Sequence, residues 1–265
     1  MNLNNIINGG NFYSLARYHF PDDSPDKYQD KDIICCHRND LMALFNVVRN
    51  HTNRYILITS FSDHESGKRE FNSKPPCIKK WFSTNVTFEH QDLIPIPYGL
   101  ESFNHKHQKV CGSDIPYLKD LDLQRLQNKS KIKDKIYVNF NLDVHSNRKN
   151  VKEILTKNGL AFSPNRMPNK DYWEDASNYL FIASPRGNGI DCHKTYEAIL
   201  MGGIAIVEKN LIFNWAEGLP LIQIEDWNQV TLEFLNNWLD KHKYTQEKIF
   251  LPYWKNVIQE AQQKL

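Results

Sequence analysis

A polar loop followed by a helix-like segment carries the side chains most capable of chemistry. The stretch Ser184–Glu208 reads SPRGNGIDCHKTYEAILMGGIAIVE, with polar residues at Ser184, Arg186, Asn188, Asp191, His193, Lys194 and Glu197. The start of a helix presents unpaired backbone N–H groups and a positive dipole end, which together bind anions. Gly187 and Gly189 allow the backbone to approach a ligand closely, and Arg186 can bind two phosphate oxygens. We therefore predict that a diphosphate lies against the amides of residues 187–190.

The helix that follows divides its faces between core and ligand. Tyr196, Ile199 and Leu200 have the spacing of a buried face, whereas His193 and Glu197 share a different face. The two oxygens of a carboxylate can accept hydrogen bonds from two neighbouring ribose hydroxyls, so Glu197 is a candidate for that role. The alternative is structural: Asn188 and Asp191 would be helix caps and Glu197 an exposed helix residue. Neither a GxGxxG fingerprint nor a P-loop is present.

Strands and helices alternate on both sides of these residues. In the first half, DIICC, RYILITSF and CIKKWFSTNV read as strands, and two prolines bar LIPIPYGL from a central position in a sheet. In the second half, KIYVNFN, YLFIAS, GIAIVE and LPLIQI read as strands, with helices between them. This order predicts α/β domains with parallel sheets, whose ligands bind at the carboxyl ends of the strands.

The fold class that we predict is α/β, with two doubly wound, Rossmann-like domains facing a cleft. Residues 118–135 read as a polar helix at the boundary. The domains are then 1–125 and 126–245. Residues 246–265 form a C-terminal helix that packs back on the first domain.

Composition excludes several classes of protein. The 265 residues carry a net charge of +2, too small for a nucleic-acid partner. No apolar run reaches the roughly 18–20 residues of a membrane span, and the polar N-terminus does not resemble a secretion signal. The five cysteines form no CxxC pair, which favours a reducing, cytoplasmic location over a zinc site or disulfide framework.

The segment from Ser184 to Val207 resembles the nucleotide-sugar signature of exostosin-like glycosyltransferases of the GT-B type. Its matching features are Ser-Pro-Arg-Gly, a second glycine, an aspartate, a basic residue, Glu-Ala, glycine and Ile-x-Ile-Val. Short viral and bacterial members are the most similar. LITSFSDHE, KKWFSTNV and LIPIPYGLES resemble the acceptor half of the same proteins. The family pattern often has arginine where His193 or Lys194 stands.

The resemblance implies transfer of a sugar from a nucleoside diphosphate, UDP or GDP, to a glycan hydroxyl without a metal or other cofactor. Arg148, Arg186 and Lys194 would then stabilise the leaving diphosphate. The formal DxD sequence at 120–122 falls in the predicted helix, so we interpret it as surface charge. An inverting reaction needs a base. Asp63, after the strand RYILITSF, is the first candidate and His64 the second, although the pair can equally be a polar turn.

The acceptor would contact aromatic and amide side chains of the first half. Trp81 and Asn85 lie in the family-like segment, and Tyr98 follows it; each aromatic residue can equally belong to the core. Two alternatives to a glycosyltransferase remain at this point: a non-catalytic nucleotide- or carbohydrate-binding module of the same fold, and another α/β transferase or nucleotide-sugar-modifying enzyme. The sequence predicts neither the sugar nor the oligomeric state.

Overall fold

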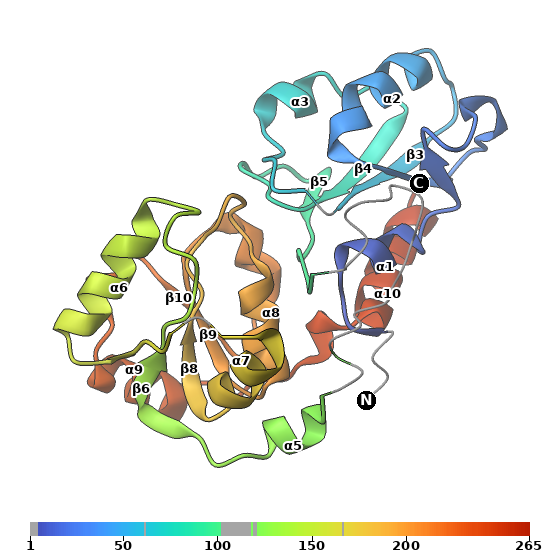
Figure 1. The fold of residues 1–265 in the computed structure, drawn as a ribbon. Helices are drawn as coiled ribbons and strands as arrows, with labels where there is room; N and C mark the ends of the chain where they lie inside the picture. Colours follow the sequence, from blue (N-terminus) through green and yellow to red (C-terminus); the bar gives the residue numbers. More distant parts are fainter. Residues whose placement is uncertain (1–4, 61, 102–117, 119–120, 166) are drawn as a thin grey trace.

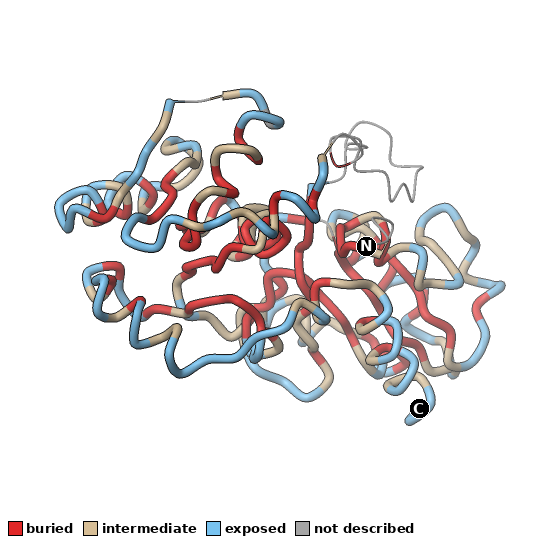
Figure 2. The backbone as a smooth tube through the Cα atoms, turned by 90° about the horizontal axis from the view of Figure 1, so that it is seen from below, coloured by how far each residue is buried: buried red, intermediate tan, exposed pale blue. Residues whose placement is uncertain are grey.

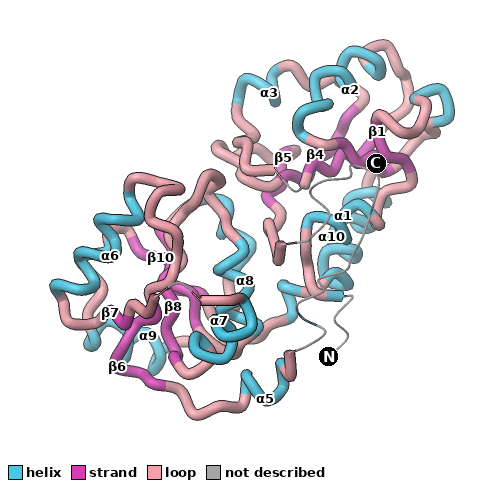
Figure 3. The backbone as a smooth tube through the Cα atoms, in the orientation of Figure 1, coloured by secondary structure: helices cyan, strands magenta, loops and turns pink. Residues whose placement is uncertain are grey.

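The protein is a mixed α/β structure with two parallel sheets. The computed structural model describes residues 5–60, 62–101, 118, 121–165 and 167–265, and these residues form two sheets of five strands (Figure 1). All strand pairs within both sheets are parallel. The strands of each sheet come from one half of the chain, as expected for two Rossmann-like domains (Figure 3).

The second sheet has the strand order β10-β9-β8-β6-β7, which reverses between β6 and β8. Its strands are β6 (Ile132–Tyr137), β7 (Ala161–Phe162), β8 (Tyr179–Ala183), β9 (Ile204–Glu208) and β10 (Leu221–Ile224). Such a reversal defines the point on a parallel sheet where ligands bind.

Both faces of the second sheet are covered. In β8, Phe181 and Ala183 pack into one apolar cluster, while Ile182, between them, packs into the other. This alternation follows from the two-residue period of a strand, and it explains why the run YLFIAS is apolar throughout. Figure 1 shows α6 and α9 on one side of the sheet and α7 and α8 on the other. The helices are α6 (Asn147–Lys157), α7 (Asn169–Ala176), α8 (His193–Leu200) and α9 (Leu232–Lys241).

The first sheet has its five strands in sequence order, without a reversal among the described strands. They are β1 (Tyr18–Phe20), β2 (Ile33–Cys36), β3 (Tyr55–Thr59), β4 (Ile78–Ser83) and β5 (Leu93–Pro95). Because crossovers are right-handed, successive connections in one direction lie on one face. The expectation of a doubly wound first domain is therefore wrong for the described strands. The proline-containing β5 lies at the sheet edge, as predicted.

The two faces of the first sheet are covered by different parts of the chain. Helices α2 (Leu41–Val48) and α3 (Lys68–Asn72) lie on one side, and α1 (Gly9–Tyr13) and α10 (Leu251–Gln263) on the other (Figure 1). The rings of Phe12 and Trp254 lie 6.1 Å apart, and Gln262 Nε2 donates to the Lys31 oxygen at 2.8 Å. The C-terminal helix therefore completes the first domain's core.

The remaining elements are short. They are α5 (Leu123–Gln127) and the 3-10 turns η2 (Pro25–Lys27), η3 (Arg38–Asp40), η4 (Leu211–Ala216), η5 (Trp227–Gln229) and η6 (Glu247–Ile249). The helix predicted over 118–135 is thus reduced, among described residues, to α5 and the single helical residue Leu118, because β6 already begins at Ile132. The predicted boundary at 125 falls inside α5. Figure 2 shows the buried strands enclosed by exposed loops and helix surfaces.

Candidate functional site

The loops at the carboxyl ends of the two sheets meet and connect the domains. Residues 184–192 follow β8 in the second sheet, at the edge of the reversal. They contact residues that follow β4 and β5 in the first sheet. We call this region the domain junction, formed by Asn85, Tyr98 and Gly99 on one side and residues 189–193 on the other.

Asn85 caps the chain leading into α8 from the opposite domain. Its Oδ1 accepts hydrogen bonds from the amides of Ile190, at 2.9 Å, and Asp191, at 3.0 Å, and its Nδ2 donates to the Ser62 oxygen at 2.8 Å. A Cβ at position 189 would lie only 2.9 Å from Asn85 Nδ2, which explains the glycine there. Only 1% of Asn85 is exposed, and its side chain is engaged in these three hydrogen bonds, so its role in acceptor binding stays a prediction that the structure does not support.

Asp191 is a second connection across the junction. Its Oδ2 accepts from the Tyr98 amide at 2.9 Å and from the Tyr196 hydroxyl, and its Oδ1 accepts from the Cys192 amide at 2.8 Å. Burial raises the pKa of Asp191 to about 6, although these three donors favour the ionised form. The Asp191 carboxylate is buried and holds the junction together, and direct binding of a donor substrate by it stays a prediction.

His193 and Tyr98 extend the junction toward Asp63. His193 Nδ1 lies 2.7 Å from the Gly99 oxygen; because a carbonyl only accepts, Nδ1 donates and Nε2 is the acceptor of a neutral ring. The rings of His193 and Tyr98 are 4.6 Å apart. The Tyr98 hydroxyl donates to Asp63 Oδ1 at 3.0 Å. Tyr98 therefore orients the predicted base, while Asp63 and His64 themselves are exposed.

Arg148, in the first turn of α6, holds the loop after β8 through hydrogen bonds to backbone oxygens. Its Nε donates to the Arg186 oxygen at 2.8 Å, and its Nη1 and Nη2 donate to the oxygens of Asn141 and Pro185 at 3.1 and 3.3 Å. Only 8% of the residue is exposed. Burial lowers its pKa, while Cys192 and the Glu208 carboxylate favour the charged form. Arg148 thus positions the loop, and its direct contact with a diphosphate stays a prediction.

Other predicted donor residues remain accessible. Arg186 is partly exposed, and its Nη2 lies 3.5 Å from Glu65 Oε1 in the first domain. Asn188 is exposed, whereas Gly187 and Gly189 are buried. The Gly187 amide donates to the Gly189 oxygen at 3.1 Å. The amides of Gly187 and Ile190 already have protein acceptors, and the anion cradle at amides 187–190 stays a prediction.

Lys194, Glu197 and Tyr172 form a polar cluster between α7 and α8. Lys194 Nζ donates to the Tyr172 hydroxyl oxygen at 2.9 Å and lies 3.8 Å from Glu197 Oε2. The Lys194 and Glu197 side chains are 17% and 16% exposed. Burial lowers the pKa of Lys194, and the Glu197 carboxylate opposes this. Burial, then Glu197, raise the pKa of Tyr172. A charged pair is thus held near the carboxyl edge of the second sheet.

Two further predictions concern residues that the structure places in the core. Trp81 in β4 is fully buried, and its Nε1 donates to Thr59 Oγ1 at 2.7 Å. The prediction that Trp81 contacts an acceptor is therefore wrong. Ser184 is also buried, with its Oγ 3.0 Å from Thr195 Oγ1 and 3.2 Å from Cys192 Sγ. It connects the end of β8 to the first turn of α8. By contrast, Tyr196, Ile199 and Leu200 are core residues, as predicted.

Glu208 is a site residue that the sequence did not indicate. At the end of β9, its Oε1 accepts from Trp227 Nε1 at 2.7 Å and Asn147 Nδ2 at 2.9 Å, and its Oε2 accepts from the Arg186 amide at 3.3 Å. It therefore joins the segments that follow three strands of the second sheet. The available signal was a carboxylate directly after the apolar run IAIV.

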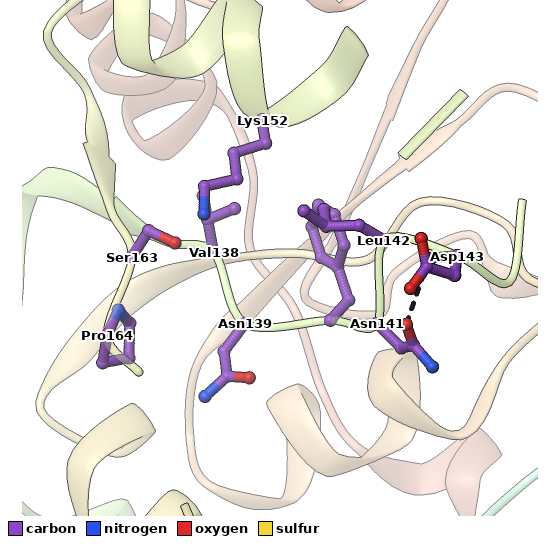
Figure 4. A pocket seen from close by; sticks show the side chains of 9 residues that line it. Val138, Asn139, Asn141, Leu142, Asp143, Lys152, Ser163 and Pro164 are labelled. Atoms are coloured by element: carbon purple, nitrogen blue, oxygen red, sulfur yellow. Dashed lines mark hydrogen bonds between the residues drawn. The ribbon is translucent and has the colours of Figure 1, made fainter. Parts of the chain in front are cut away.

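Two pockets border the carboxyl edge of the second sheet. One, of about 380 Å³, lies beyond β6 and β7, and Lys152 extends toward it from α6 (Figure 4). It is lined by Val138, Asn139, Phe140, Asn141, Leu142, Asp143, Lys152, Ser163 and Pro164. The other pocket, of about 410 Å³, lies between η4 and the first-domain segment 88–95, which contains β5. None of the predicted site residues lines either pocket.

In the part of the chain that the structure describes, no group of three or more His, Cys, Asp or Glu side chains is arranged to hold a metal ion. Of the DxD sequence, Asp120 lies outside the described residues. Asp122 Oδ1 accepts from the Arg125 amide at 3.0 Å and caps α5. A metal-independent reaction stays a prediction.

The comparisons with known proteins add no family. No model of a known protein family matches the chain, and no curated protein matches its sequence. Among the described residues, no helix is both long and apolar enough to span a membrane. The resemblance to exostosin-like enzymes thus depends on the sequence motif alone.

Proposed function

We propose that this chain is a glycosyltransferase of the GT-B type, related to the exostosin-like enzymes. It would transfer a sugar from a nucleoside-diphosphate donor to a glycan hydroxyl, with inversion and without a metal. The observation that carries the proposal is the meeting of two sets of loops. The segment after β8, at the strand-order reversal, contacts first-domain segments that include the candidate base Asp63 through Tyr98.

The second domain would hold the donor. Arg186 and Lys194 are cations that remain partly accessible near the end of β8, and Glu197 offers two acceptor oxygens to ribose hydroxyls. Arg148 and Glu208 would fix the loop that carries Arg186. Because Asn85 occupies the amides of Ile190 and Asp191, the developing negative charge of the leaving diphosphate depends on cationic side chains more than on backbone amides.

The first domain would supply the base. In an inverting transfer the acceptor oxygen attacks the anomeric carbon, the bond to the diphosphate breaks, and the acceptor proton moves to the base. Asp63 is exposed and is held by the Tyr98 hydroxyl, so one carboxylate oxygen remains available. His64 is the second candidate for the same proton.

A non-catalytic nucleotide- or carbohydrate-binding module is the second candidate function. The observation that favours it is the occupation of the α8 entrance by Asn85, which leaves fewer free amides for a reacting diphosphate. Such a module would bind nucleotides without transferring or hydrolysing the sugar.

The test is turnover of UDP- and GDP-sugars with glycan acceptors, followed by mass spectrometry. Asp63→Asn retains the acceptor for Tyr98, so we expect it to abolish transfer while nucleotide affinity in calorimetry stays unchanged. Glu197→Ala should weaken nucleotide binding about tenfold or more, as expected for loss of hydrogen bonds to a charged group. Asp134→Asn, at an exposed position in β6, is the control.

Four results would reject parts of the proposal. Near-normal transfer by Asp63→Asn removes that residue as the base. Unchanged nucleotide affinity in Glu197→Ala removes Glu197 from the donor site. Nucleotide binding by the wild type without any transfer favours the binding module. Addition of EDTA should leave transfer intact, and a strict requirement for a divalent metal contradicts the metal-free mechanism.

A further inference from the structure

Two arginines from opposite domains contact one glutamate. Arg38 begins η3 directly after β2 in the first domain, and Arg186 lies in the loop after β8 in the second. Arg38 Nη2 donates to the Glu65 backbone oxygen at 3.1 Å, and Arg186 Nη2 lies 3.5 Å from Glu65 Oε1. Glu65 follows β3, so all three residues lie at carboxyl ends of strands. The two arginines belong to different domains, so both reach Glu65 only because the two sheets face one another.

Both guanidinium groups have an unused donor. Among the described residues, none accepts a hydrogen bond from Nε of Arg38 or from Nε of Arg186, and both atoms are buried. Nε and Nη2 share one edge of a guanidinium and form a fork that fits two oxygens of a carboxylate or phosphate. A buried donor without an acceptor costs free energy. On each arginine, Nη2 thus has a partner and Nε has none, so each guanidinium can bind a further anionic oxygen.

The carboxylates now present satisfy these forks poorly. The Glu65 side chain is 50% exposed and 3.5 Å from Arg186, and Glu70 Oε1 lies 3.3 Å from Arg38 Nη2. Ion pairs of an exposed carboxylate contribute little to stability. Glu65 can therefore rotate into solvent at small cost. A diphosphate has more oxygens and more charge than one carboxylate, and charge-assisted bonds to it are stronger.

We propose that Arg38 and Arg186 together bind the diphosphate of the donor, and that the Glu65 carboxylate occupies this position until the donor displaces it. The inference depends on the proposed function for the identity of the donor, but not for the binding of the anion. It adds a residue of the first domain to a site that the sequence motif assigns entirely to the second. Donor binding would thereby hold the two domains together.

Inorganic pyrophosphate, which carries no base or sugar, is the probe, titrated into the full-length protein by calorimetry. Arg38→Gln and Arg186→Gln should each weaken its binding about tenfold or more. Glu65→Gln should strengthen it several-fold, because the competing charge is removed. Arg17→Gln is the matched control, since Arg17 pairs with Asp32 on the first domain and is 55% exposed. We expect it to bind as the wild type does.

The outcomes separate this inference from the proposed function. Unchanged pyrophosphate affinity in Arg38→Gln, or weaker affinity in Glu65→Gln, overturns the inference, as does absence of binding to the wild type. Glu65→Gln changes only a half-exposed side chain, so it tests the site even if an arginine variant does not fold. If pyrophosphate binding follows the expected pattern but no nucleotide sugar is turned over, the anion site stands and the glycosyltransferase proposal fails. If sugar is transferred and Arg38→Gln keeps the wild-type KM for the donor, the glycosyltransferase proposal stands and the anion site at Arg38 fails.

Discussion

The entrance to α8 and the pair Arg38–Arg186 both lie where the domains meet, yet their hydrogen-bonding groups are in opposite states. At the α8 entrance, the amides of Ile190 and Asp191 share the Asn85 oxygen, and the Asp191 carboxylate has three donors. At the arginine pair, two buried Nε atoms have no acceptor among the described residues. The capacity to bind an anion therefore depends on which donors are still free, and residue type alone does not reveal this.

The largest effect should come from Arg148, the arginine whose donors are used within the protein. Arg148→Ala leaves the oxygens of Asn141, Pro185 and Arg186 without their donor. We therefore expect the free energy of unfolding, measured in urea, to fall by about 3–5 kcal/mol. Lys149→Ala, the neighbouring residue with 61% exposure, should change stability by less than about 0.5 kcal/mol. A variant at Arg148 with normal stability but without pyrophosphate binding would contradict the view that the donors of Arg148 are used within the protein.

A smaller effect, dependent on pH, is expected at Asp191. Its pKa of about 6 in the folded protein lies above the ordinary value of 3.8 for an aspartate, so the folded state binds the proton more tightly. The stability from that proton is fully present below the unfolded pKa and is lost as pH rises through 6. Asn does not titrate. The unfolding free energy of wild type relative to Asp191→Asn should therefore fall by about 2 kcal/mol from pH 4 to pH 7.

Urea unfolding of both proteins across this pH range measures the difference directly. A difference that stays constant, or rises with pH, would show that the Asp191 carboxylate is not penalised by burial. Asp92→Asn provides a control, because Asp92 forms a partly exposed pair with Lys80 away from the junction.

The smallest effect is the difference in stability between two variants of Asn85, which sharpens the comparison. Both Asn85→Gly and Asn85→Ala remove the acceptor from the amides of Ile190 and Asp191, at a cost of about 2 kcal/mol. Asn85 has φ of 51°, which glycine adopts freely, so alanine should cost about 1 kcal/mol more. Hydrogen exchange at the two amides should accelerate in both variants. Unchanged exchange would mean that Asn85 does not hold the junction.

The sequence predicts those parts of the fold that depend on local pattern. The apolar run ending at Ser184 became β8, and the spacing of Tyr196, Ile199 and Leu200 identified the buried face of α8. The start of β6 at Ile132 was missed, because the first residues of that strand are exposed and polar. Its position is set by pairing with β8 at Tyr179, which local sequence does not encode.

The sequence predicts only which segments contribute candidate site residues, and not how these residues contact one another. The sequence predicts that the candidate residues lie in loops after parallel strands, where ligands bind. The sequence did not predict that Asn85 would cap the opposite domain, that Trp81 would be core, or that Glu65 would contact Arg186. Each of these depends on how two separate sheets face one another, and single-sequence patterns carry no information on that arrangement.

The return of α10 to the first domain means that the order of the chain and the order of the domains do not coincide. The chain leaves the second domain between Gln246, which bonds Ile199, and Ile249, which bonds Ile7. A fragment ending near residue 125 would lack Trp254 and Ile258 and would expose apolar surface beside Phe12. Neither domain is therefore available by a single cut, and shortening the protein at its last residues would damage the part that is synthesised first.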